Sequence, residues 1–158
     1  MNSATDEKYT FAKDIVSFAN AGGTDPKRIL IGFEDSGDFY VPSTDQDRAD
    51  HVSAMAILGD ETRLQQTVSS RTLPTPSVRV AHSGTHREGP YVLLEIRRDI
   101  VMLPYRVFRS PDDRRSPDAL SLGEVWIRKG STNDQATSLE IEVLERQAAL
   151  QMSIRAGA

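Results

Sequence analysis

The chain has 158 residues, of which 38% are hydrophobic, 27% are charged and none is cysteine. This length fits a single domain, and the lack of cysteine excludes disulfides, thiol nucleophiles and zinc sites built on thiolates. The polar start of the sequence and the lack of a long apolar run predict neither a signal peptide nor a membrane span, so we expect a soluble, cytoplasmic protein.

Charge is unevenly distributed along a chain whose formal net charge is −4. Residues 1–70 carry 6 basic and 12 acidic groups, whereas residues 71–135 carry 11 basic and 8 acidic groups, and ten of those eleven basic groups are arginine. Arginine makes forked contacts with phosphate. The sequence therefore permits a local basic face on an acidic protein, with a solvated surface of paired charges as the alternative.

The first part of the chain predicts two helical regions around a hairpin. Apolar residues at helical spacing predict a helix over 7–21. The apolar run 28–34, a turn and the segment 39–41 predict a buried hairpin. Residues 43–70 predict helix again, with a break near Gly59.

The second part predicts strands and one loop. Residues 77–81 and 91–96 predict two strands joined by a polar loop. The segment 103–109 predicts a short extended piece, and the proline- and aspartate-rich segment 110–120 predicts a mobile loop. A last strand is expected over 123–130.

A terminal helix follows a cap at Thr137 or Ser138. Its apolar face is expected to hold Leu139, Val143, Leu144 and Leu150. The order of elements predicts an α+β domain, with one mixed sheet and flanking helices, over residues 1–150. Residues 151–158 are expected to form a frayed tail.

Two stretches of the sequence resemble the Schlafen AlbA-like domain, a family also described among bacterial proteins as divergent ATP-binding. The first, 15–37, contains Ser-Phe-Ala-Asn at the end of a helix, a double glycine, and an apolar strand that ends in Gly-Phe-Glu-Asp. The second, 124–133, contains Trp-Ile-Arg-Lys-Gly-Ser, and Leu-Pro-Tyr at 103–105 lies between the two. The resemblance covers nearly the whole chain and implies the α+β fold of that family.

The resemblance also implies candidate catalytic residues. Nucleases of the family act on transfer and ribosomal RNA with three carboxylates, and Glu34 and Asp35 hold the place of one of them. These two residues are therefore the candidate catalytic and metal-binding pair, and two carboxylates at the end of a strand can approach one Mg²⁺ or Mn²⁺ ion. A solvated turn is the alternative. The sequence lacks the upstream Glu-x-x-x-x-Glu-Phe-Lys motif of the family and a lysine-containing phosphate loop.

The candidate nucleic-acid contacts are basic residues of the arginine-rich middle segment, where clustered arginines favour phosphate binding. They are Arg97, Arg98, Arg106, Arg109, Arg128 and Lys129. Trp126 is either a core residue or a platform for base stacking beside them.

Three hypotheses for function follow. The first is a nucleic-acid-binding module, for RNA rather than DNA, which contacts phosphates through arginine and has neither intrinsic catalysis nor a cofactor. The second is a degenerate or split metal-dependent endoribonuclease that uses Glu34 and Asp35 with Mg²⁺ or Mn²⁺. The third is a protein-interaction subunit of a defence or regulatory complex. A homodimer is compatible with each hypothesis.

Overall fold

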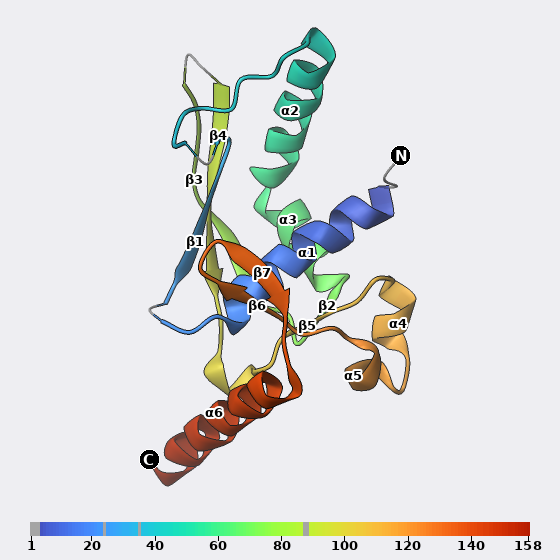
Figure 1. Ribbon diagram of the computed structural model, residues 1–158, viewed down its shortest axis with the longest axis vertical. Coiled ribbons are helices and arrows are strands. Elements are labelled where there is room, and N and C mark those ends of the chain that lie inside the picture. Colours follow the sequence, from blue (N-terminus) through green and yellow to red (C-terminus); the bar gives the residue numbers. More distant parts are fainter. Residues whose placement is uncertain (1–3, 24, 35, 87–88) are drawn as a thin grey trace.

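The computed structural model describes residues 4–23, 25–34, 36–86 and 89–158 (Figure 1). Its helices are α1 (Ala4–Asn20), α2 (Asp45–Leu58), α3 (Glu61–Ser69), α4 (Pro111–Arg115), α5 (Ala119–Leu122), α6 (Ser138–Gly157) and the short 3-10 helix η1 (Ile100–Met102). Its strands are β1 (Lys27–Ile31), β2 (Thr72–Leu73), β3 (Ser77–His86), β4 (Gly89–Arg97), β5 (Arg106–Val107), β6 (Trp126–Lys129) and β7 (Thr132–Gln135). None of the described helices combines the length and apolarity needed to cross a bilayer.

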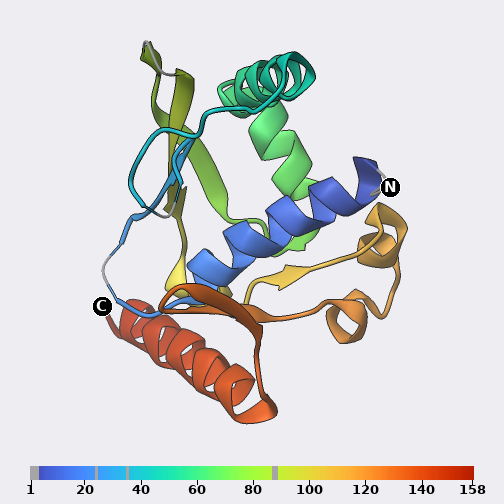
Figure 2. The ribbon, with the colours of Figure 1, turned by 45° about the horizontal axis from the view of Figure 1, so that its top comes forward.

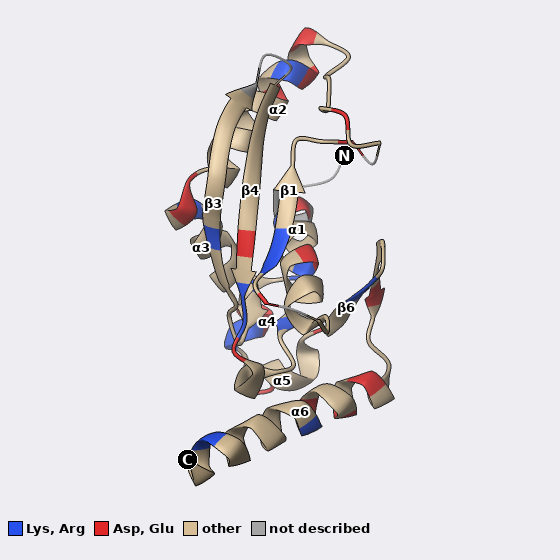
Figure 3. Ribbon diagram, turned by 90° about the vertical axis from the view of Figure 1, so that its left-hand side faces the viewer, with Lys and Arg blue, Asp and Glu red and all other residues tan. Residues whose placement is uncertain are grey.

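The described strands form three small antiparallel sheets, ordered β1-β4-β3, β2-β5 and β6-β7. Helices α1, α2 and α3 lie on one side of the three-stranded sheet (Figures 1 and 2). The opposite side of this sheet faces away from the helices (Figure 3). The predicted α+β class is confirmed, with small separate sheets in place of one mixed sheet.

The core lies between α1 and the three-stranded sheet. As the helical spacing predicts, one face of α1 is completely buried; it consists of Ala12, Ile15, Val16 and Ala19. Alternate residues of β4 enter the same core, namely Val92, Leu94 and Ile96. Because side chains alternate along a strand, the residues between them point to the opposite face of the sheet.

β1 is followed by the predicted hairpin only at its turn, where the N–H of Glu34 donates to the carbonyl of Asp38 and the N–H of Tyr40 donates to that of Gly32. It pairs along Lys27–Ile31 with β4, and the segment expected to return beside it makes a single bridge, between Phe33 and Phe39. The chain turns away directly after β1 at Gly32, whose φ is +103°, a conformation that favours glycine. The strand that pairs with the whole of β1 is therefore β4, which lies far away in the sequence. Turn residues next to β1 cannot predict such a distant pairing.

β3 and β4 are longer than predicted. Their ladder continues past a register shift after Val80, from His82 opposite Leu93 to His86 opposite Gly89. The prediction of a polar loop over this stretch is wrong. Backbone pairing does not need an apolar pattern on both strands: His82, Ser83 and Thr85 of β3 are exposed, whereas Val92 of β4, opposite Ser83, is buried.

The segment expected to be a mobile loop forms α4 and α5. The side chain of Ser110 accepts a hydrogen bond from the backbone N–H of Asp112 and caps α4, and Pro111 occupies its first turn. Arg114 donates a hydrogen bond to the carbonyl of Ser69 and ties α4 to the end of α3. Serine and proline also start helices, and here Ser110 and Pro111 begin α4.

α6 begins where predicted and extends further. Thr137 and Glu140 form a capping box in which each side chain accepts from the other residue's backbone N–H. Residues 151–157, expected to fray, are part of the helix. The guanidinium of Arg155 donates two hydrogen bonds, of 2.9 and 3.1 Å, to the carboxylate of Asp99, which holds this end of α6 against the domain.

The predicted apolar face of α6 is mostly exposed. Leu144 is buried, together with Ala148, whereas Leu139, Val143 and Leu150 are exposed. The prediction is wrong for these three residues because α6 contacts the domain chiefly through η1 and buries only a narrow part of its surface.

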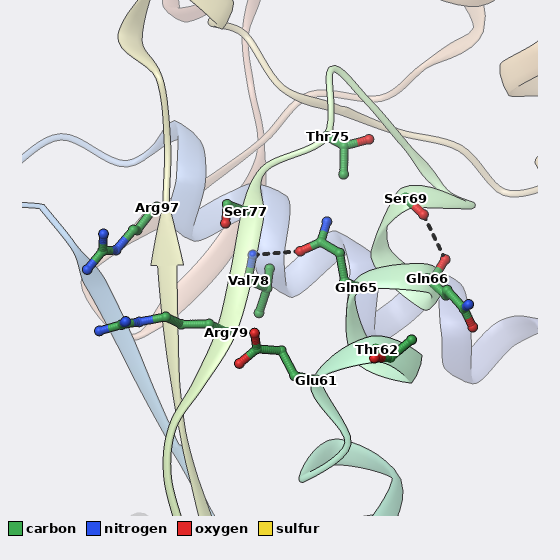
Figure 4. A pocket seen from close by; sticks show the side chains of 10 residues that line it. All are labelled: Glu61, Thr62, Gln65, Gln66, Ser69, Thr75, Ser77, Val78, Arg79 and Arg97. Carbon is green, nitrogen blue, oxygen red and sulfur yellow. Dashed lines mark hydrogen bonds between the residues drawn. The ribbon is translucent and has the colours of Figure 1, made fainter.

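α3 covers the outer edge of β3 with two side chains. The carboxylate of Glu61 accepts from the N–H of Val80 at 3.0 Å. The amide oxygen of Gln65 accepts from the N–H of Val78 at 2.9 Å (Figure 4). The same amide donates to the carbonyl of Pro76 at 3.3 Å. Glu61 and Gln65 lie one helical turn apart on α3, so this helix takes the place of a neighbouring strand along this stretch.

Candidate nucleic-acid interface

The outer face of the three-stranded sheet carries both basic and aromatic side chains. From β4 it receives Tyr91, Leu93, Glu95 and Arg97, which alternate with the buried residues of that strand. Opposite them stand Arg28 and Leu30 of β1 and Arg79 and His82 of β3. In Figure 3 this face is turned to the viewer, and basic positions of β1 and β3 flank an acidic position of β4.

Three arginines converge on one carboxylate at the centre of this face. Glu95 lies 3.6 Å from Arg28, 3.0 Å from Arg79 and 2.9 Å from Arg97, measured between nitrogen and oxygen. The Glu95 side chain is only 4% exposed, whereas the three arginine side chains are 49–62% exposed. Arg79 and Arg97 lie side by side and point away from α3 (Figure 4).

The charges of these four side chains do not balance. The hydrogen bond from Arg97, followed by the bond and charge of Arg79, holds the pKa of Glu95 below its ordinary value, so this carboxylate is ionised at neutral pH. One negative charge then faces three positive ones. The cluster has an excess of two positive charges on an exposed surface, with forked donors suited to phosphate oxygens.

An aromatic cluster lies further along the same face. The ring of Tyr91 is 6.3 Å from that of Phe33 and 6.4 Å from that of Phe39, and the two phenylalanine rings are 4.3 Å apart. The Tyr91 hydroxyl lies 2.9 Å from Nε2 of His82, which is exposed. Such rings provide flat surfaces on which nucleic-acid bases stack.

Gly84 makes room for the Tyr91 ring. It stands opposite Tyr91 in the β3–β4 ladder, and a Cβ added at this position would lie 2.9–3.1 Å from the hydroxyl and ring carbons of Tyr91. Only glycine permits this close approach. The Tyr91 ring therefore lies close over the β3 backbone at Gly84.

Together the two clusters place exposed positive charge and aromatic rings along one face of the sheet. Glu95 follows Tyr91 by four residues, which is about 13 Å along β4. A single strand of nucleic acid that runs along β4 would meet aromatic rings at one end and guanidinium groups at the other. We call this the sheet face, defined by Arg28, Arg79, Glu95, Arg97, Phe33, Phe39, His82 and Tyr91.

Of the six basic residues predicted to contact nucleic acid, the structure brings Arg97 alone to the sheet face. Its sequence neighbour Arg98 points to the other side, where its side chain is 7% exposed. Arg98 donates to the carbonyls of Ala19 and Ala21 and to the carboxylate of Asp25. These hydrogen bonds satisfy carbonyl groups at the carboxyl end of α1, so Arg98 is a structural residue.

Arg106 and Arg109 lie on and after β5, outside the sheet face. Arg106 donates to the carbonyl of Gly123 at 3.3 Å. Arg109 donates to the carboxylate of Glu124 at 2.9 Å and lies over the ring of Tyr9. Their positions are set by contacts with neighbouring segments.

Arg128 and Lys129, the predicted contacts on β6, also lie apart from the sheet face. Arg128 lies over the ring of Phe18 and donates to the side chain of Asn133. Lys129 forms an ion pair of 2.6 Å with Glu140, and this hydrogen bond raises the pKa of Lys129. The structure thus does not gather the predicted arginine-rich segment into one surface.

One member of the candidate metal pair, Glu34, lies at the turn after β1. Glu34 is exposed there; its N–H donates to the carbonyl of Asp38 and its carbonyl accepts from the N–H of Gly37. Asp35 lies outside the described residues. Within the part of the chain that is described, no three histidine, aspartate or glutamate residues form a group that could hold a metal ion.

Trp126 is held in a polar cluster between α1 and β6. Its indole N–H donates to Glu124 at 2.9 Å, and the hydroxyl of Tyr9 donates to the same carboxylate at 2.6 Å. Burial, followed by this hydrogen bond, raises the pKa of Tyr9 to about 12. Burial alone would raise the pKa of Glu124, but hydrogen bonds from Tyr9, Trp126 and Arg109 hold it below its ordinary value. Trp126 is therefore a structural residue here.

Sequence reasoning missed Arg28 and Arg79. The signal was the alternation of arginine with apolar residues in Val78-Arg79-Val80, beside Leu94-Glu95-Ile96 in the partner strand. Alternation assigns these charges to the outer face of a strand, but only the pairing of β1 with β4 and of β4 with β3 brings them together.

Comparison with known proteins finds no matching family model, no similar curated protein and no similar solved structure.

Proposed function

We propose that the sheet face binds single-stranded nucleic acid, RNA in preference to DNA, and acts by binding rather than by cleavage. The observation that carries this proposal is the convergence of Arg28, Arg79 and Arg97 on the single carboxylate of Glu95. The charge excess of this cluster suits a phosphate backbone, and the nearby rings suit unpaired bases.

Two further points support RNA as the ligand. Sequence-specific recognition of RNA targets single strands whose bases stack on aromatic side chains, and an open antiparallel sheet is one of the surfaces used for it. The resemblance of residues 15–37 and 124–133 to the Schlafen AlbA-like domain favours RNA as well. We propose membership of that family on these segments.

Fluorescence anisotropy with a short labelled single-stranded RNA tests the proposal. The double variant Arg28→Gln, Arg79→Gln should bind more weakly than the wild type, and its affinity should depend less on salt. Each lost phosphate contact lowers the slope of log affinity against log salt by about 0.7 for a single strand. The matched control is Arg63→Gln, which removes an exposed arginine of α3 that is paired with Asp60.

Equal salt slopes for the double variant and the wild type would contradict binding at the sheet face. Metal-dependent cleavage gives a separate result. If transfer RNA is cut in the presence of Mn²⁺, and Glu34→Ala abolishes the cutting, the nuclease hypothesis replaces the binding proposal. A folded chain that binds no RNA even at low salt would leave the interaction-subunit hypothesis.

A further inference from the structure

α6 presents a long surface that the rest of the domain does not cover. Its 20 residues span about 30 Å, yet only Leu144 and Ala148 are buried. In Figures 1 and 2 the helix lies at one end of the molecule, with a long side turned away from the sheets.

The uncovered surface carries an apolar stripe, defined by Leu139, Val143, Leu150 and Ile154. These side chains are 69%, 46%, 64% and 55% exposed. At 100° per residue they fall within about 60° of the helix circumference, about 80° or more from Leu144 and Ala148. Leu139 and Val143 also border a hollow that is lined on the domain side by Asn20, Gly22 and Ile127. The stripe is about 22 Å long.

The four residues of the stripe are spaced symmetrically along α6, so their spacing reads the same from either end of the helix. Leu139 and Val143 are one turn apart, as are Leu150 and Ile154, and the midpoint between the pairs falls at Arg146 and Gln147. An interface between identical chains about a two-fold axis requires each residue to meet its symmetry counterpart reciprocally. An antiparallel copy of α6 satisfies this condition, with Leu139 facing Ile154 and Val143 facing Leu150.

We propose that α6 is the contact surface of a homodimer in which two copies of the helix pack antiparallel along the apolar stripe. The charge at the centre is compatible with this arrangement. Arg146, beside the two-fold axis, forms an ion pair of 2.6 Å with Glu142 on its own helix. Each copy therefore brings a balanced pair, rather than a bare positive charge, to the axis.

The available area indicates a weak, reversible dimer. Burial of a leucine, isoleucine or valine side chain removes about 60–120 Å² of apolar surface from water, and each stripe residue has about half of its surface to lose. For the eight side chains of two copies the total is roughly 240–480 Å², well below the roughly 1,200 Å² that stable complexes exceed. The dimer should therefore form and dissociate with protein concentration.

Sedimentation equilibrium over a concentration series tests the dimer. The wild type should shift from monomer to dimer as concentration rises, and Leu150→Glu should stay monomeric. The matched control is Met152→Glu, which changes a residue of α6 that is 57% exposed but lies off the stripe; it should dimerise like the wild type. A wild type that stays monomeric throughout, or a Leu150→Glu variant that still dimerises, overturns the proposal.

Cysteine cross-linking tests the antiparallel arrangement, since the chain has no cysteine of its own. Chains with Val143→Cys and chains with Leu150→Cys should form a disulfide faster when mixed than either does alone. Faster self-linking of each single variant would show parallel helices and overturn the arrangement. This measurement is independent of RNA binding, so it can fail or succeed separately from the proposed function.

Discussion

The side-chain amide of Asn20 holds the backbone of Tyr105 at two points: its oxygen accepts from the Tyr105 N–H at 2.8 Å, and its nitrogen donates to the Tyr105 carbonyl at 2.9 Å. The same nitrogen donates to the carbonyl of Trp126 at 3.0 Å. Asn20 is 2% exposed. One side chain at the end of α1 thus joins three segments that are far apart in the sequence.

Asn20→Ala should destabilise the fold strongly. The substitution leaves the N–H and carbonyl of Tyr105 buried without their partner, and each such group costs about 1–3 kcal/mol. We expect the free energy of unfolding in urea to fall by at least ~2 kcal/mol. The control Gln46→Ala removes an exposed amide that donates to Asp50 and should change stability by about 0.5 kcal/mol or less. A loss no larger for Asn20→Ala than for the control would contradict this role.

Tyr91→Leu should weaken RNA binding without altering its salt dependence. Stacking of one base on an aromatic ring contributes about 1–3 kcal/mol, which corresponds to a loss of affinity of roughly 5-fold to 150-fold. No phosphate contact is removed, so the slope against salt should stay as in the wild type. Anisotropy at several salt concentrations measures both quantities, with Tyr40→Leu, an aromatic residue packed against His51, as the control.

Glu95→Gln should have opposite effects on stability and on binding. Without the carboxylate, Arg28, Arg79 and Arg97 repel one another, so the free energy of unfolding should fall. The sheet face gains a positive charge, so RNA affinity at low salt should rise and its salt dependence should steepen. Glu145→Gln, which neutralises an exposed glutamate of α6, should show neither effect. Weaker binding by Glu95→Gln would argue against phosphate contacts at these arginines.

Glu140→Gln should remove part of the loss of stability in acid. The hydrogen bond from Lys129, then those from Thr137, lower the pKa of Glu140 from 4.5 to about 2. Between these values the unfolded chain binds the proton more readily, so this group stabilises the fold above pH 4.5 and loses its contribution as pH falls toward 2. Urea unfolding at several pH values should show the wild type and the variant converging in acid. A constant difference between them at all pH values would contradict the depressed pKa.

The parts of the fold that depend on local pattern were predictable. The helical spacing of α1, the break between α2 and α3, and the Thr137 cap of α6 each follow from residues within a few positions of one another. The short helices after Ser110 were missed because their capping residues also occur in loops.

The sheet face could be predicted only in part because it is assembled by pairing between distant strands. Arg97 was identified from the local density of arginine, whereas Arg28 lies far from that density and meets Glu95 through the pairing of β1 with β4. Arg97 and Arg98 are neighbours in the sequence and were therefore predicted together. Because side chains alternate along a strand, the two arginines point to opposite sides of the sheet. Charge content thus predicted a basic surface but not its members.

The cover that α3 places over β3 also limits self-assembly. An uncovered strand edge is a template on which another chain can add a strand, and Glu61 and Gln65 occupy the donors of Val78 and Val80 that such a strand would need. At the opposite edge of the sheet, β1 is short and begins with Lys27 and Arg28. These two positive charges repel an identical strand. The start of the β3 edge and the β1 edge are thereby protected against the addition of a strand from another chain.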